Sequence, residues 1–122
     1  MSSLLLMISA TLVLITCLTH SVVGEKRLIG PVMALRAGVL QSDLARQVLR
    51  FAWHLMSALG LIVAFLLFQY ARNPSTIDPA MIVLIGLILA GCGLFDAIYT
   101  RGKHIGWPLL TAAGATTLAA LL

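Results

Sequence analysis

Three histidines and two carboxylates are the residues whose chemistry could build a ligand site in this chain: His20, His54, His104, Glu25 and Asp96. Imidazole nitrogens are common ligands of transition metals, and carboxylates complete or orient such sites. No two histidines stand four residues apart, and no Cys-x-x-Cys occurs. A metal or haem site therefore depends on the elements that would bring these distant residues together.

The apolar composition of the chain indicates what those elements are. The chain has 122 residues, of which 61% are hydrophobic and 10% charged, whereas soluble domains carry about 25% charged residues. The apolar residues form long blocks, which is typical of a chain whose solvent is lipid. The formal net charge is +4, and the basic residues flank these blocks. No basic face carries aromatic residues for stacking, so nucleic acid is excluded as a partner.

The blocks predict a single transmembrane domain over residues 1–122. Its four predicted spans cover about residues 4–23, 51–71, 79–98 and 105–122. Each is expected to be a helix, because a backbone exposed to lipid must satisfy its own hydrogen bonds. Proline and glycine in residues 73–75, 78–79 and 101–103 mark the turns. The predicted fold class is all-α, an integral membrane four-helix bundle.

The basic residues orient this bundle. Five of them precede the second span and two precede the fourth: Lys26, Arg27, Arg36, Arg46, Arg50, Arg101 and Lys103. Only Arg72 lies on the other side. Because cytoplasmic loops are enriched in Lys and Arg, we expect both termini outside the cytoplasm of a bacterial inner (plasma) membrane. A cleaved signal peptide is disfavoured, since Met1-Ser2-Ser3 has no basic residue.

The connection between the first two spans carries structure of its own. Residues 28–35 are apolar but too short to span, so we expect a short interfacial segment flanked by basic residues. Ser42 is the predicted N-cap, with Asp43 in the first turn, of a helix that continues into the second span. Its predicted polar stripe contains Asp43, Arg46 or Gln47, Arg50, His54 and Ser57.

With this topology the ionisable residues gather at the cytoplasmic end of the bundle. The candidate polar or ligand cluster is His20, Glu25, Arg50, His54, Asp96 and His104. In one interpretation it is an interfacial layer, in which Asp96 pairs with Arg50, Arg101 or Lys103. Trp53 and Trp107 would then be interface anchors.

The other interpretation is a metal or haem site with His20, His54 and His104 as ligands. Cys17 and Cys92 lie one turn from His20 and Asp96, and both are expected to be buried free thiols. The cofactor stays open between none, haem and a transition metal.

Small residues spaced four apart in the third and fourth spans predict close helix packing there. The first span contains no acid, which disfavours a small proton-coupled transporter. Ser57 and Thr111 are expected to bond the preceding helical turn rather than to act as nucleophiles.

Three segments carry a family resemblance. They are residues 20–27 (HSVVGEKR), residues 50–54 (RFAWH) and residues 102–108 (GKHIGWP). The pattern resembles a group of small uncharacterised bacterial inner-membrane proteins with four predicted spans. The resemblance implies that location and adds no activity.

The expected function is therefore non-enzymatic: a structural, accessory or regulatory subunit. The alternative is a histidine-ligated metal or haem membrane protein, and a small transporter is less favoured. The expected partners are the lipid bilayer and either a second copy of the chain or a larger membrane complex.

Overall fold

The computed structural model describes residues 2–122, and within them every regular element is helical. The elements are α1 (Ser2–Leu18), α2 (Gly30–Ala34), α3 (Asp43–Arg72), α4 (Pro79–Tyr99) and α5 (Gly106–Ala119). The predicted all-α class is thus confirmed for these residues. Three helices, Ser2–Ala34, Asp43–Arg72 and Pro79–Tyr99, are long and apolar enough to cross a membrane.

The first helix runs much further than the predicted first span. α1 continues through two π-helical turns, Thr19–Val23 and Glu25–Ile29, directly into α2. Ser2–Ala34 is therefore one helix of 33 residues, about 50 Å long at 1.5 Å per residue. The sequence predicts a separate interfacial segment over residues 28–35, but residues 28–34 continue this helix instead. π turns of this kind occur often at functional sites.

α3 begins and ends as the sequence predicts. The Ser42 side chain accepts a hydrogen bond from Ala45 N at 3.4 Å, which confirms the predicted N-cap. The helix then continues for 30 residues and ends before Asn73. Asp78 caps α4 by accepting from Ala80 N at 2.8 Å. The breaks predicted at Asn73 and Asp78 are confirmed.

The fourth predicted span is shorter in the structure than in the sequence interpretation. α5 has 14 residues, or about 21 Å of helix, against about 30 Å of hydrocarbon in a typical bilayer. It starts after a turn in which Arg101 and Gly102 both have positive φ, 53° and 71°. Glycine adopts this conformation at no steric cost, which explains Gly102 at this position.

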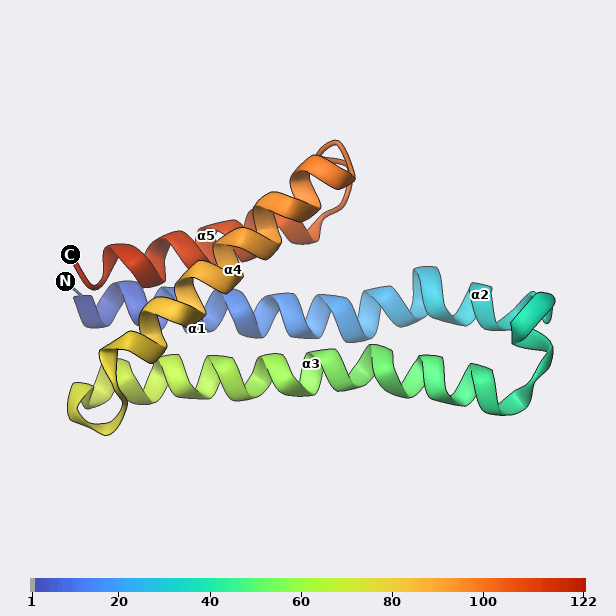
Figure 1. Ribbon diagram of the computed structural model, residues 1–122, viewed down its shortest axis with the longest axis horizontal. Helices are drawn as coiled ribbons and strands as arrows, with labels where there is room; N and C mark the ends of the chain where they lie inside the picture. Colours follow the sequence, from blue (N-terminus) through green and yellow to red (C-terminus); the bar gives the residue numbers. More distant parts are fainter. Residues whose placement is uncertain (1) are drawn as a thin grey trace.

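The helices form an elongated bundle in which α1 packs against α3 and α5, and α4 packs against α5 (Figure 1). Both termini lie at the end that holds the α3–α4 connection, and the α4–α5 turn points the other way. The helix ending in α2 and the first half of α3 extend well beyond that turn. We call residues 24–50 the projecting hairpin.

The core lies in the part of the bundle near the termini. Leu67, Ile82 and Ala113 have no exposed surface. Ser9, equally buried, donates to Ala113 O at 2.8 Å and lies 2.6 Å from Thr117 Oγ1. This hydroxyl joins α1 to α5 where no water is available to replace the bond.

Small residues let α4 and α5 approach closely. A Cβ on Gly114 would lie 2.3 Å from Ala90 N, and a Cβ on Gly93 would lie 2.3 Å from Thr111 Oγ1. Contacts this short are available only to glycine, so the predicted close packing of these two segments is confirmed.

Candidate functional site

His20 and Trp53 form a reciprocal contact between the first helix and α3. Trp53 Nε1 donates to the His20 carbonyl at 3.0 Å, and His20 Nε2 lies 3.2 Å from the Trp53 carbonyl. Their rings stack with centroids 3.9 Å apart and planes 15° apart. Gly24 makes room for the indole, because a Cβ there would lie 2.5 Å from Trp53 Cζ2. Trp53 thus packs half-buried against the first helix, and its expected role as an interface anchor stays a prediction.

Directly beside this contact, four polar side chains connect the same two helices. Ser21 Oγ lies 2.6 Å from His54 Nδ1, and His54 Nε2 lies 3.3 Å from Glu25 Oε2. Arg50 Nη2 completes the set at 2.9 Å from Glu25 Oε1. We call Ser21, Glu25, Arg50 and His54 the interhelical polar chain. Ser21 and Glu25 stand four apart on one helix, as do Arg50 and His54 on the other, so each pair shares a face.

The two carboxylate oxygens of Glu25 differ in their polar contacts. Oε1 takes the Arg50 contact, whereas Oε2 is shielded from solvent and makes no hydrogen bond of good geometry within the described residues. His54 Nε2 lies within ion-pair distance of Oε2 but is poorly aligned for a hydrogen bond. When Nε2 carries the ring proton, Ser21 donates to Nδ1 and the Nε2–H faces Glu25.

A second, smaller cluster lies at the α4–α5 turn. Asp96 Oδ2 is 2.5 Å from His104 Nδ1, so Asp96 pairs with a histidine rather than with the basic residues considered from sequence. Trp107 Nε1 donates to Gly102 O at 3.2 Å and closes the turn on itself. The six candidate residues therefore form two groups, one between the long helices and one in this turn.

The histidines do not form a shared metal centre. Across residues 2–122, no group of three or more His, Cys, Asp or Glu side chains is placed to hold a metal ion. Both ring nitrogens of His54 face protein partners, and Nδ1 of His104 faces Asp96. Cys17 and Cys92 are both free thiols, but only Cys17 is buried as expected, whereas Cys92 is exposed on the bundle surface. The donor set thus does not fit a multi-ligand metal site.

Sequence reasoning missed Ser21, although the segment HSVVGEKR contains it four residues before Glu25. The order Ser21, His54, Glu25 is that of a nucleophile, a base and an orienting carboxylate. However, Ser21 lies inside a continuous helix, where backbone N–H groups bond helix carbonyls and cannot stabilise an oxyanion. The arrangement therefore joins two helices, and the backbone N–H groups of this helix are not free to act as oxyanion donors.

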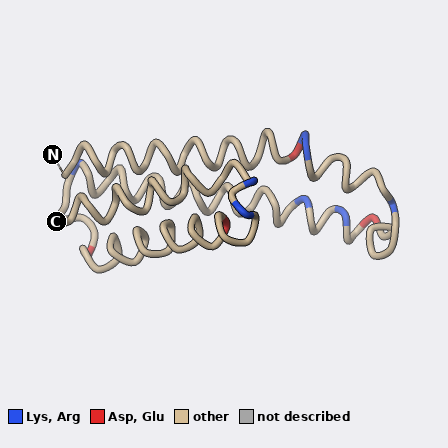
Figure 2. The backbone as a smooth tube through the Cα atoms, turned by 90° about the horizontal axis from the view of Figure 1, so that it is seen from above, with Lys and Arg blue, Asp and Glu red and all other residues tan. Residues whose placement is uncertain are grey.

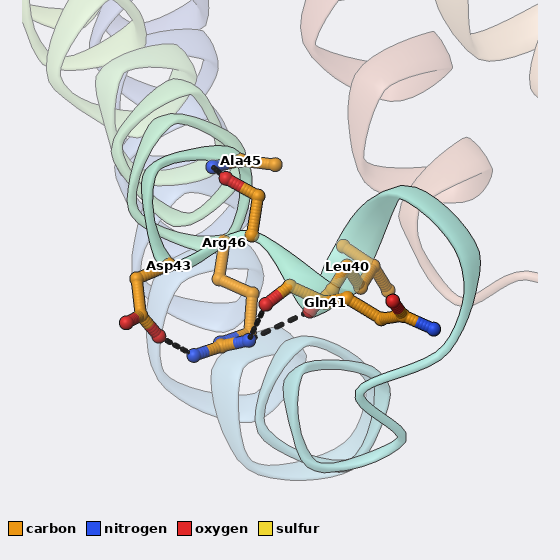
Figure 3. A network of polar contacts seen from close by, with 6 residues as sticks. Leu40, Gln41, Asp43, Ala45 and Arg46 are labelled. Carbon is orange, nitrogen blue, oxygen red and sulfur yellow. Dashed lines mark hydrogen bonds and ion pairs between the residues drawn. The ribbon is translucent and has the colours of Figure 1, made fainter.

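A groove of about 460 Å³ adjoins the interhelical polar chain. It is lined by Met33, Asp43, Arg46, Gln47, Arg50, Phe51 and His54. Figure 3 shows how Arg46 is held: it pairs with Asp43 and donates to the carbonyls of Leu40, at 2.7 Å, and Gln41, at 3.3 Å. The predicted polar stripe of α3 is confirmed as far as His54, because its members all line this groove. The expectation that Ser57 and Thr111 bond the preceding helical turn is wrong, because both hydroxyls are buried without a hydrogen-bond partner among the described residues.

Comparisons with known protein families, with curated proteins and with solved structures found no match. The class of the protein is defined by its fold, a helical bundle in which three helices are long and apolar enough to cross a membrane.

Proposed function

We propose that this chain spans a bacterial inner membrane four times, with both termini outside the cytoplasm. The arrangement of the ends supports this topology, because both termini and the α3–α4 connection lie together (Figure 1). Seven of the eight basic residues belong to the projecting hairpin and the α4–α5 turn, which lie away from the termini, the turn about halfway along the molecule and the hairpin beyond it (Figure 2). The positive-inside rule assigns these two segments to the cytoplasm. The family resemblance supports the bacterial location.

The fourth span is α5 together with its flanking apolar residues. Residues 105–122 contain no charged side chain, and α5 packs along both α1 and α4. A short helix crosses a bilayer by local thinning or by packing against longer neighbours.

Topology reporters test this proposal. Alkaline phosphatase fused after Leu122 should be active, and a fluorescent protein that folds only in the cytoplasm should stay dark there. The same pair inserted between Gly102 and Lys103 should give the reverse result. An active phosphatase at residue 102 would contradict the orientation. An inactive phosphatase after Leu122 would show that α5 does not cross the membrane.

We further propose a non-enzymatic role, as an accessory or regulatory subunit that presents the projecting hairpin to a protein of the same membrane complex. The observation that supports this role best is the length of the two helices that form the hairpin, 33 and 30 residues. At 1.5 Å per residue they are about 50 and 45 Å long, against about 30 Å of hydrocarbon. The interhelical polar chain holds the two helices together where the hairpin begins.

The hairpin surface is apolar as well as basic. Leu35, Val39 and Leu44 are about 70–80% exposed near its tip. A protein that covered these side chains would remove apolar surface from water, which favours association.

Site-specific photo-crosslinking in living cells tests this role. A benzophenone amino acid at Val39 or Leu44 should give a discrete crosslinked protein, whereas the same probe at Met56, which is 63% exposed in the apolar part of α3, should give only lipid adducts. Crosslinks between two differently tagged copies would show a homo-oligomer instead. Identical patterns at Val39 and Met56 would contradict the role.

A further inference from the structure

The groove between α2 and the first half of α3 combines charge with apolar surface. Arg46, Arg50 and Gln47 supply donors, and Met33 and Phe51 supply apolar walls. Phe51 is also the first residue of the apolar run predicted as the second span. The groove therefore lies where the helices pass from apolar to polar sequence, which is headgroup depth in an inserted bundle.

Its two arginines are held differently. The Arg46 side chain is only 13% exposed and is fixed by Asp43 and two backbone carbonyls. Arg50 is 49% exposed and pairs with Glu25 through Nη2. A half-exposed guanidinium keeps donors for a second anion, and guanidinium–phosphate contacts are among the stronger hydrogen bonds.

The surroundings favour an anionic ligand. Residues 24–50 hold five basic and two acidic side chains, a formal excess of three positive charges. Among residues 2–122, Lys26, Arg27 and Arg36 make no ion pair. Basic segments beside a membrane attract anionic lipids.

We infer that this groove binds the phosphate of an anionic membrane lipid, with Arg50 and Gln47 contacting the phosphate, Phe51 contacting the first acyl carbons and Met33 lining the groove on the side of the hairpin tip. A cavity with both polar donors and apolar walls suits an amphiphile better than a free phosphate ion. The inference rests on the proposed membrane insertion and not on the protein partner.

Glu25 competes with the lipid for Arg50. Because the two anions share one guanidinium, removal of the Glu25 charge should strengthen lipid binding, and removal of the Arg50 charge should weaken it. Opposite effects from the two members of one ion pair are not expected when a variant merely disturbs the hairpin.

The experiment is native mass spectrometry of the delipidated protein in neutral detergent, titrated with phosphatidylglycerol or phosphatidylcholine. One phosphatidylglycerol should bind per chain in preference to phosphatidylcholine. Arg50→Gln should weaken it by about tenfold, the scale of one lost charged hydrogen bond, and Glu25→Gln should tighten it. The matched control is Arg36→Gln, which removes the same charge from the same hairpin outside the groove and should change affinity little.

Three results would overturn the inference. The first is an equal loss from Arg36→Gln, which would indicate diffuse attraction. The second is glycerol phosphate that binds as tightly as the lipid, since the ligand would then be a free anion. The third is the absence of saturable phosphatidylglycerol binding. None of these would affect the reporter fusions, so failure here is distinguishable from failure of the proposed topology.

Discussion

His20 and Trp53 contact each other through both their rings and their backbones: the rings stack at 3.9 Å, and each side chain reaches the other residue's carbonyl. Indole and imidazole polar groups that leave water need partners. Here His20 and Trp53 each supply a carbonyl partner for the other, although the two residues lie 33 positions apart in the sequence and on different helices. This contact and the interhelical polar chain fix the register of the two long helices at the base of the projecting hairpin.

Gly24 is required for that register. Gly24→Ala should lower stability by about 1–3 kcal/mol, the usual cost of overpacking, because its Cβ would fall 2.5 Å from Trp53 Cζ2. Thermal unfolding in detergent, followed by near-UV circular dichroism, measures the effect. Gly91→Ala is the control, since its Cβ would have no atom within 4 Å. Equal losses in the two variants would contradict the packing described for Trp53.

His54 should hold the hairpin helices together. His54→Ala removes the hydrogen-bond partner of the Ser21 hydroxyl and the imidazole beside Glu25 Oε2, and a polar group that loses its partner costs about 1–3 kcal/mol. Spin labels at Leu28 and Val48 should then give a broader distance distribution by electron–electron double resonance. His104→Ala, in the separate turn cluster, should leave that distribution unchanged. A broadening of the same size in both variants would argue that the two clusters act as one.

The Arg50–Glu25 ion pair should contribute little to stability by itself. The two side chains are 49% and 29% exposed, and solvent screening limits pairs of this kind to about 1 kcal/mol or less. A double-mutant cycle with Arg50→Gln and Glu25→Gln should give a coupling energy of that size, and it should fall as salt is raised. A coupling of several kcal/mol that ignores salt would indicate a fully desolvated pair.

The buried hydrogen bond of Ser9 should stabilise the contact between α1 and α5 near the termini. Ser9→Ala removes a buried bond to Ala113 O and the contact with Thr117, and should cost about 1 kcal/mol, as other hydrogen bonds between membrane helices do. Thr11→Ala is matched, because Thr11 donates only to Met7 O within its own helix. Unfolding in mixed micelles, with an increasing fraction of a denaturing detergent, measures the free energy of unfolding of both variants. A neutral Ser9→Ala would show that α5 is held by packing alone.

The long apolar blocks and the helix caps were predictable because they depend on local sequence. Ser42, Asn73 and Asp78 mark helix ends through their own side chains. The continuation of the first helix to Ala34 was not predictable, since Gly30-Pro31 reads as a break until the preceding π turns are known. Topology placed His20, His54 and His104 toward one end but could not give their rotation about each helix axis. That rotation directs His54 to Ser21 and Glu25, and His104 to Asp96, instead of toward a shared centre.

The projecting hairpin on the cytoplasmic side is the central claim, and cysteine labelling tests it most directly. In a chain whose Cys17 and Cys92 are replaced by alanine, single cysteines at Val39 and Ser75 are treated with a membrane-impermeant maleimide. Ser75→Cys should react in intact spheroplasts, whereas Val39→Cys should react only after lysis. Labelling of Val39→Cys from outside would reverse the orientation, and its protection in both preparations would place the hairpin tip within the bilayer.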